Sequence, residues 1–545
     1  MNTKPSEMEN SFYAGIQSLR NEELSILLKK FGVKALASGT EDRISFAKAA
    51  ISCGAMGMAS EAVKGLDPLQ EEIKIFLENG GVDPEGAKYS VFYPASCSPE
   101  IAIDSSRILV DGECSHCSGN VRIDLLKPRL GNSKFICPHC LTILEVDKKE
   151  LRPFLEEMFV EHMRALEAKL RSKELSYQDC EHLVQLADSV FPWLKVRFGT
   201  LRSERIGHFA MNTEKYLSER AAGITDSETF DFLGHSEPVS NKFLKLMWNR
   251  VIRYSPVASV VAPLLSPESP YNTYKDLHGN NGRDDYKLWH RSEPFLKFTQ
   301  KEEDMARSEL ARMGIEPGAE YVCLNVRDNA YLKSHLKGKD WSYHDFRDSD
   351  IDTYKDAALA LAERGYYVLR MGAVTEKTFE LDHPRVIDYS NYFRSEFMDV
   401  YLCGTCSFMI STGTGIDGIS FIFRRPVLYV NYAQAGAVVD WDPNCITMFK
   451  RFFWIDGERE LALREIFGHG VASLNKIEQL KELGVHMRNN SPKELMEACL
   501  EMAEFVEGGC VSSLSDNQVL ANSIIRQHIG MIGRMAECYL EKMAI

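Results

Sequence analysis

The chain has 545 residues, which is too many for one hydrophobic core and, at roughly 150 residues per domain, predicts three to four domains. Apolar residues make up 44% and charged residues 26%, and this ordinary globular balance excludes disordered, collagen-like and coiled-coil chains. Acidic side chains outnumber basic ones by 78 to 64, and the resulting net charge of −14 argues against nucleic acid or an anionic membrane as a partner.

The sequence shows no sign of membrane insertion or secretion. No apolar run approaches the roughly 18 residues that span a bilayer, and the opening MNTKPSEMENSFYAG lacks the apolar segment of a secretion signal. The 14 cysteines are too few for a disulfide scaffold, and four of them form two tight pairs, which indicates metal binding in a reducing compartment. We therefore expect a cytoplasmic protein.

Residues 1–95 are expected to form a helical module. The segments LRNEELSILLKKFG and AKAAISCGAMGMASEAVKG have helical spacing of apolar residues and end at glycine. Modules of this kind often contact partner proteins, although packing within the chain is the commoner explanation.

Residues 96–149 have the pattern of a zinc ribbon. Short β-type segments surround two CxxC pairs that lie 19 residues apart, and zinc takes four soft ligands in a tetrahedron. Because the protein fills all four positions, the ion would be structural and not catalytic. Four unrelated cysteines or a redox pair are the alternatives, and His116 and His139 are possible substitute ligands. The expected ligands are Cys114, Cys117, Cys137 and Cys140.

The next two segments are a helical connector over 150–190 and a first Rossmann-like domain over 191–317. In that domain a strand over 195–201 leads through a polar loop to a helix near 211–222, and the stretch 256–294 is rich in loop-forming residues. His208 titrates near neutrality and is a candidate general base, with Glu214 as a second candidate. A packed or solvated histidine is the simpler alternative.

The clearest organisation lies between residues 318 and 490, where short apolar runs alternate with helical segments. Runs with little alternation are typical of strands covered on both faces, so we expect a doubly wound parallel sheet in this second domain. The stretch 491–545 is expected to be helical to its end. The predicted strands are 321–326, 366–371, 385–389, 408–411 and 426–431.

Polar side chains follow each of these strands, and in an open α/β sheet ligands bind beyond the carboxyl ends of the strands. The Ser-Thr-Gly-Thr-Gly run, between a strand and a helix, is typical of a phosphate cradle, although such turns are also common in loops. Arginines beside it would suit a diphosphate. Together with Arg347 from a nearby loop, the candidate site residues are Asn325, Arg327, Arg370, Gly372, Asp388, Tyr389, Ser411, Thr412, Gly413, Thr414 and Gly415.

Two further motifs in this domain are expected to be structural. Asp348-Ser-Asp350 has the form of a metal-binding DxD pair but its position before a helix favours a capping role. Cys403-Gly-Thr-Cys406 has no partner pair, so its cysteines are expected to pack as small buried side chains.

The segment 195–480 resembles a group of bacterial glycosyltransferases of surface-polysaccharide and glycan assembly. The resemblance lies in short pieces that follow one another in order: Asn-Val-Arg-Asp at 325–328, HDFRDSDI, GYYVLRMG, IDY, RSEFMDVYL, and STGTGI followed by RRPVLYVN. It implies a GT-B architecture, that is, two Rossmann-like domains with the active site between them. The helical N-terminus and the zinc ribbon lie outside the shared region.

The resemblance also implies roles for particular residues. Arg327 matches the arginine that holds the donor diphosphate in fucosyltransferase-like enzymes, and the Ser411-Thr412-Gly413 turn matches the phosphate partner of heptosyltransferase-like enzymes. The implied reaction moves a sugar from a nucleotide-sugar donor to a glycan or protein acceptor, without a catalytic metal.

A second hypothesis is a non-catalytic binding protein. In that case the zinc ribbon and the N-terminal helices would bind a protein partner, and the Rossmann-like part would be a degenerate scaffold. A phosphate-binding hydrolase is disfavoured because the sequence has no GxSxG nucleophile motif.

Overall fold

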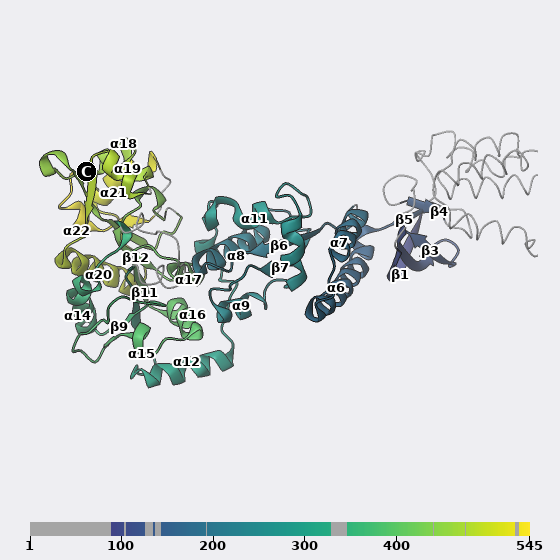
Figure 1. Cartoon of the computed structure of the whole chain (residues 1–545), viewed down its shortest axis with the longest axis horizontal. Coiled ribbons are helices and arrows are strands. Elements are labelled where there is room, and N and C mark those ends of the chain that lie inside the picture. Colours follow the sequence, from purple (N-terminus) through teal and green to yellow (C-terminus); the bar gives the residue numbers. More distant parts are fainter. Residues whose placement is uncertain are drawn as a thin grey trace, which may run out of the picture. The chain divides into compact units, whose positions relative to one another are not determined.

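We analysed a computed structural model of the chain (Figure 1). The structure describes residues 89–102, 105–125, 134–136, 143–191, 193–328, 346–439, 441–474, 476–528 and 533–545. The chain divides into two compact units, Met1–Arg197 and Phe198–Ile545, which are described separately. Most of the predicted helical module, residues 1–88, lies outside the described residues.

The N-terminal unit contains a five-stranded sheet in the order β3-β2-β1-β5-β4. Residues 89–95 belong to its longest strand and not to a helix, because Tyr89–Phe92 pair with β5 and Phe92–Pro94 pair with β2 before a register shift between Pro94 and Ser96. The pairs β2–β3 and β4–β5 are antiparallel, and β1–β5 is parallel. The strands are β1 (Tyr89–Ala102), β2 (Ser105–Cys114), β3 (Asn120–Asp124), β4 (Lys134–Ile136) and β5 (Ile143–Val146).

Two helices complete this unit and occupy the segment predicted as a helical connector. Helix α6 (Lys148–Ser172) begins where the Asp147 carboxylate accepts from the N–H of Lys149. Helix α7 (Tyr177–Val190) begins with a capping box between Ser176 and Asp179, a motif that satisfies free N–H groups of a first turn. Among the described residues, no helix is long and apolar enough to cross a membrane.

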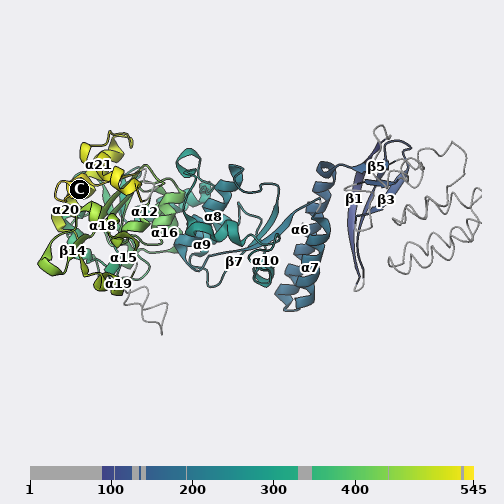
Figure 2. The ribbon, with the colours of Figure 1, turned by 90° about the horizontal axis from the view of Figure 1, so that it is seen from above.

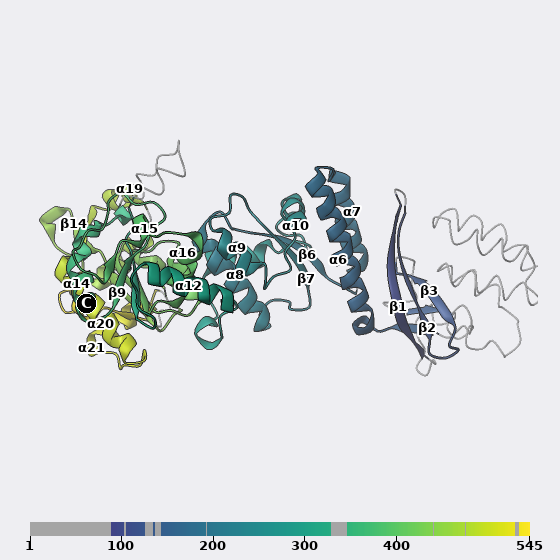
Figure 3. The ribbon, with the colours of Figure 1, turned by 90° about the horizontal axis from the view of Figure 1, so that it is seen from below.

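The C-terminal unit contains a short β-α-β segment, with α8 between strands β6 and β7 in the chain (Figures 2 and 3). Strands β6 and β7 pair, and isolated parallel bridges join Phe198 to Asn272 and Leu233 to Tyr254. The stretch 256–294, predicted as loops, also contains short helices. The elements are β6 (Val196–Leu201), α8 (Ile206–Ala221), β7 (Phe230–His235), α9 (Lys242–Trp248), α10 (Pro256–Val261) and α11 (Tyr274–His278).

A seven-stranded parallel sheet forms the centre of this unit, in the order β10-β9-β8-β11-β12-β13-β16. All five strands predicted between residues 321 and 431 are confirmed. The chain order runs outward from β8 in one direction and then reverses, so the switch point lies between β8 and β11. Such a switch point is where open α/β sheets bind ligands. The strands that flank and extend it are β8 (Tyr321–Asn325), β9 (Tyr367–Arg370), β10 (Val386–Ile387), β11 (Phe408–Ser411) and β12 (Val427–Tyr432).

The sequence analysis missed the far side of this sheet. Strand β13 (Cys445–Phe449) follows β12, and the edge strand β16 (Arg534–Met535) lies in the stretch predicted to be helical to its end. Arg534 and Met535 extend because they pair with Ile446 and Thr447 of β13. Strands β14 (Arg451–Trp454) and β15 (Val485–Arg488) form a separate antiparallel pair.

Helices cover both faces of the sheet (Figures 1 and 3). Helices α14 and α20 pack together on one side of the strands, and α16 and α17 pack together on the other. Helix α17 also contacts α8, which joins the two halves of the unit. The helices are α12 (Gln300–Arg312), α14 (Lys355–Glu363), α15 (Tyr389–Tyr392), α16 (Glu396–Thr405), α17 (Asp417–Ile422), α18 (Leu463–Gly468), α19 (Ile477–Glu482), α20 (Pro492–Glu507), α21 (Asp516–Arg526) and α22 (Glu537–Leu540).

Candidate functional site

Polar residues from β8 and β11 meet at the switch point of the sheet. Asn325 and Ser411 end these strands as register partners. The backbone N–H of Arg327 donates to the Thr412 hydroxyl at 2.9 Å, and the Asn325 amide donates to the Thr414 hydroxyl at 2.7 Å. The two predicted strand-end motifs, Asn-x-Arg and Ser-Thr-Gly-Thr-Gly, therefore lie side by side.

A segment just before the 3-10 helix Ile351–Tyr354 brings two more charged groups to this edge. Arg347 donates from Nη2 to the Gly413 carbonyl at 2.7 Å, and Arg327 donates from Nε to the Asp348 carboxylate at 3.1 Å. The Ser349 N–H donates to the Arg327 carbonyl at 3.1 Å, which ties the segment to the end of β8. Asp350 caps the short helix, as predicted, whereas Asp348 pairs with Arg327 and is not a cap.

Lys450 is a third cation at the same place, and the sequence analysis missed it. It follows directly after β13, is 4% exposed, and donates from Nζ to the backbone carbonyl of Asp348 at 2.7 Å. Burial lowers the pKa of Lys450 to about 8; the charge of Asp348 opposes this shift and that of Arg327 adds to it. Asp348 thus binds two cations at once, one through its carboxylate and one through its carbonyl.

The three cations lie close together: the charge of Arg327 acts on both Arg347 and Lys450, and the Asp348 carboxylate also acts on both. Burial, and then the charge of Arg327, lower the pKa of Arg347. The Nη2 atom of Arg327 is buried and has no hydrogen-bond partner among the described residues. A buried guanidinium N–H without an acceptor is costly, and an anion would supply both an acceptor and compensating charge. The cluster of Arg327, Arg347 and Lys450, hereafter the cation cluster, can therefore hold an anion.

The Ser411–Gly415 turn differs from the backbone cradle that the sequence predicted. Its N–H groups already donate within the domain: Thr412 to the Asn325 carbonyl at 3.3 Å, Gly413 to Ser411 Oγ at 3.1 Å, and Thr414 to Asp417 Oδ2 at 2.9 Å. Asp417 is buried in the first turn of the six-residue helix α17, so it places an acidic group there. The turn contributes the hydroxyls of Thr412 and Thr414, which accept one bond each and keep a proton to donate.

Two glycines of this turn are needed for packing. Gly413 has φ +82°, and a Cβ there would lie 2.6 Å from the Tyr432 ring. Gly415 meets the start of α8: a Cβ on Gly207 would lie 2.9 Å from the Gly415 Cα. The close approach of Gly207 and Gly415 brings the first turn of α8 directly against the Ser411–Gly415 turn.

His208 directly follows Gly207 on α8, the residue that packs against Gly415. Its Nδ1 lies 3.1 Å from Asn212 Oδ1, one helical turn away. Burial, and then the charge of Arg202, lower the pKa of His208, which favours the neutral imidazole. A neutral, half-buried imidazole at this position can accept a proton.

Glu214, the other predicted base, has a structural partner instead. It is fully buried, and Arg424 donates to its Oε1 at 2.5 Å. Burial raises the pKa of Glu214 to about 7, although the charge of Arg424 opposes the shift. Arg424 follows α17 and also donates to the carbonyls of Ile422 and Ser292. The pair joins α8 to the end of α17 and gives Glu214 a structural role, while its Oε2 has no hydrogen-bond partner among the described residues.

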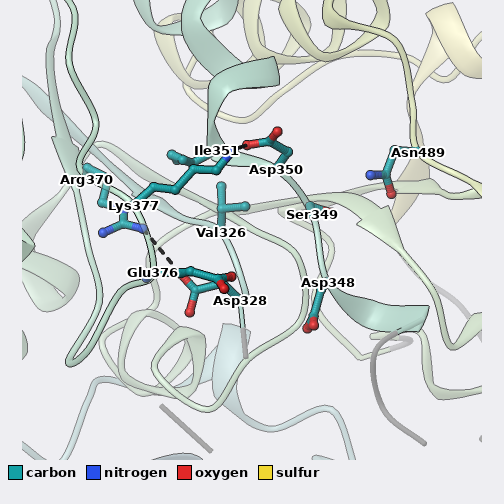
Figure 4. Close-up of a pocket in the computed structure, with 10 residues that line it drawn as sticks. All are labelled: Val326, Asp328, Asp348, Ser349, Asp350, Ile351, Arg370, Glu376, Lys377 and Asn489. Atoms are coloured by element: carbon teal, nitrogen blue, oxygen red, sulfur yellow. Dashed lines mark hydrogen bonds and ion pairs between the residues drawn. The ribbon is translucent and has the colours of Figure 1, made fainter. Parts of the chain in front are cut away.

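A cavity of about 300 Å³ adjoins the site on the β9 side (Figure 4). Arg370, the last residue of β9, is fully buried; its Nη2 lies 3.7 Å from Asp328, and its Nε and Nη1 have no hydrogen-bond partner among the described residues. Arg370 therefore lines this cavity and does not join Arg327 as predicted; Arg347 and Lys450 do. The cavity is lined by Val326, Asp328, Asp348, Ser349, Asp350, Ile351, Arg370, Glu376, Lys377 and Asn489.

Three other predicted site residues have structural partners. Gly372 has φ +147°, and a Cβ there would lie 2.7 Å from Thr375. Asp388 is buried, caps α15, and accepts from the N–H of Phe379 at 2.8 Å. The Tyr389 hydroxyl is buried against Asp399 at 2.9 Å. The side chains of Asp388 and Tyr389 are therefore occupied by hydrogen bonds within the domain, and Gly372 is required by the local backbone packing.

The cysteine motifs have different outcomes. Cys403 and Cys406 are fully buried among apolar side chains, as predicted. Cys114 ends β2 and Cys117 lies in the turn to β3, where the Ser118 N–H donates to the Cys114 carbonyl at 2.8 Å. Cys137 and Cys140 lie outside the described residues. Within the part of the chain that the structure describes, no cluster of three or more potential metal ligands is present.

Comparisons with known proteins were made for the whole chain. No family model matches, and no curated protein matches. Among solved structures, the chain is similar to E. coli ADP-heptose LPS heptosyltransferase II, with 12% identity over 46% of this chain and 90% of that chain (TM-score 0.28). It is similar to a family 9 glycosyl transferase of Veillonella parvula, with 10% identity over 57% of this chain and 97% of that chain (TM-score 0.35).

A third solved structure, the E. coli heptosyltransferase WaaC with ADP, shares 12% identity over 51% of this chain and 100% of that chain (TM-score 0.24). All three proteins are glycosyltransferases by name. These TM-scores are below 0.5, so the chemistry of the site is inferred from this chain's own residues and not from the three solved structures.

Proposed function

We propose that the chain is a glycosyltransferase of GT-B type that moves a sugar from a nucleotide-sugar donor to a glycan or protein acceptor. The observation that carries the proposal is the cation cluster at the switch point of a parallel sheet. Arg327 and Arg347 are held there by Thr412, Asp348 and Gly413, and the buried Nη2 of Arg327 faces no acceptor. Preorganised arginines of this kind suit the diphosphate of a nucleotide sugar.

The cation cluster also fits the chemistry of the transfer. When the bond between the sugar C1 and the diphosphate breaks, the bond's electron pair leaves with the diphosphate, whose negative charge increases. Three fixed cations stabilise that charge in the transition state and need not reorganise when it develops. The side chains themselves supply the positive charge, which supports transfer without a catalytic metal.

His208 is proposed as the general base. It directly follows Gly207, the α8 residue that packs against Gly415 of the Ser411–Gly415 turn. Its Nε2 would take the proton of the acceptor hydroxyl while the hydroxyl oxygen forms the new bond to C1.

The cavity beyond Asp348 is proposed to hold the nucleoside, because its carboxylates can accept from ribose hydroxyls and its volume of about 300 Å³ suits a nucleoside.

The function is tested by screening the full-length protein with nucleoside diphosphates and then assaying nucleotide sugars. A donor nucleotide is expected to raise Tm, because a ligand that binds only the folded state stabilises it by mass action. The matching nucleotide sugar should then release its diphosphate when an acceptor glycan is supplied. If no nucleoside diphosphate raises Tm or binds in calorimetry, the binding-protein hypothesis is favoured instead.

A structural zinc ion is proposed for the N-terminal unit. Cys114 pairs in register with Phe92 of β1, and Ile136, one residue before Cys137, pairs with Ile143, which pairs with Tyr89 of β1. The strand ends that flank both CxxC pairs thus lie at the same end of the sheet, as a four-cysteine site requires. Metal analysis of the purified protein should find one zinc per chain, and Cys114→Ser should lose it. An equal zinc content in that variant would contradict the site.

A further inference from the structure

Asn212 lies one helical turn after His208 on α8 and is almost completely buried. Side chains four residues apart lie on the same face of a helix, so the two side chains meet there. Asn212 Oδ1 is 3.1 Å from His208 Nδ1. A Cβ on Gly282 would lie 2.6 Å from the same Oδ1, which shows how tightly the amide is enclosed.

A second hydrogen bond fixes which way the Asn212 amide points. Its Nδ2 donates to the backbone carbonyl of Leu277 at 2.7 Å. A carbonyl oxygen can only accept, so the NH₂ group must face Leu277 and the amide oxygen must face His208. The flipped amide would place two oxygens together at Leu277 and lose that bond.

The orientation of the amide determines the tautomer of the histidine. Because Asn212 Oδ1 can only accept, the neutral His208 ring must carry its proton on Nδ1 to make this bond. Its other nitrogen, Nε2, then has a free lone pair, and no described residue makes a hydrogen bond to it.

We propose that Asn212 is a positioning residue that holds His208 in the Nδ1–H tautomer and so presents Nε2 as the proton acceptor in the transfer reaction. The inference rests on the proposed role of His208 as general base. In the step itself, Nε2 takes the acceptor's hydroxyl proton, and the ring becomes an imidazolium whose Nδ1–H still donates to Asn212. The hydroxyl oxygen bonds to the sugar C1, and the diphosphate leaves with the electron pair of the broken bond.

The charged groups around His208 come from two elements. The loop after β6 contributes Arg202, Glu204 and Arg205, and α11 contributes His278; the arginines and His278 oppose protonation of His208, whereas Glu204 favours it. The Asn212 hydrogen bond also favours the charged ring. Removal of that bond should therefore move the acidic limb of the rate–pH profile to lower pH.

The direct test is the tautomer itself, measured by NMR of the full-length protein with ¹⁵N-labelled histidine. The His208 signals are assigned by their loss in His208→Ala. The protonated nitrogen is expected to be Nδ1 in the wild type and in Asn212→Asp, whose carboxylate also accepts. In Asn212→Leu the ring should populate the Nε2–H form. A wild-type Nε2–H ring, or one unchanged in Asn212→Leu, would overturn the proposal.

Kinetics provide the second test. Asn212→Leu is expected to lower kcat about tenfold with an unchanged donor KM, because only part of the ring population presents a basic Nε2. Asn212→Asp loses the bond to the Leu277 carbonyl and should be less stable, but its carboxylate still accepts from Nδ1. At a temperature where it is folded it should keep a higher kcat than Asn212→Leu and move the acidic limb to higher pH. Full activity in His208→Ala would contradict the proposed base and leave the NMR result on the tautomer intact, so the two failures are distinguishable.

Discussion

The backbone N–H of Arg327 donates to the hydroxyl of Thr412 at 2.9 Å, across the point where the order of the parallel sheet reverses. This bond joins two short motifs that lie 85 residues apart in the sequence. It holds the end of β8 against the Ser411–Gly415 turn, while the Arg327 guanidinium binds the Asp348 carboxylate and the Asp348 carbonyl accepts from Lys450. The proposed donor site depends on this arrangement.

Lys450→Met should weaken the binding of a nucleoside diphosphate about tenfold at pH 7, because it removes one charge-assisted hydrogen bond. The wild-type affinity should fall as pH rises through about 8, where Lys450 loses its proton. A phosphate group is fully ionised by then, since its second pKa is about 6. Calorimetry between pH 7 and 9 measures this, and the variant should show no such fall.

Lys493→Met is the matched control for that experiment, because Lys493 is an exposed lysine on α20 whose side chain is 75% exposed. Its affinity and pH dependence should match the wild type. An identical alkaline fall in the Lys450→Met protein would show that another group titrates.

Gly207→Ala should lower both Tm and transfer activity. The new Cβ would lie 2.9 Å from the Gly415 Cα and 3.0 Å from its carbonyl oxygen, and because both are backbone atoms, α8 must move away from the Ser411–Gly415 turn. Overpacking of this kind costs about 1–3 kcal/mol. Gly279→Ala serves as the control, because a Cβ there meets nothing within 4 Å and φ is −58°. Equal activity in the two variants would contradict close packing at Gly207.

Glu214→Ala and His208→Ala should have opposite effects. Glu214 and Arg424 form a buried pair, and removal of one partner leaves an uncompensated charge, which costs about 3 kcal/mol of folding free energy. The Glu214→Ala protein should therefore have a lower Tm but retain kcat at a temperature where it is folded. His208→Ala should keep its Tm and lose transfer at least about 100-fold. Thermal melts and single-temperature kinetics distinguish the two roles.

The parallel strands could be predicted because a strand buried on both faces is a short, continuous apolar run. Residues such as those of β8 and β11 show this pattern clearly, and their ends carry Arg327 and Thr412. Strand β13 was missed because only Lys450 and Arg451 separate Cys445–Phe449 from the aromatic residues of β14, so no turn signal marks the boundary between the two strands. Lys450 was missed with it.

The partner of a charged residue cannot be read from local sequence. Glu214 looks like a candidate base until the fold places Arg424, 210 residues later, against it. Arg370 likewise stands at a strand end in the predicted way, but its side chain lines the cavity, where it lies near Asp328. Strand ends thus identify the edge of the sheet, and only tertiary packing decides which of the side chains there meet.

The most direct test of the central claim is calorimetric titration of the wild type and Arg327→Ala with ADP, GDP and UDP, with Tm of each ligand-free protein measured in parallel. We expect one of these nucleotides to bind the wild type and the variant to lose about 10- to 100-fold in affinity, with its ligand-free Tm unchanged within about 2 °C. Equal affinity in the two proteins would show that the cation cluster does not hold the diphosphate.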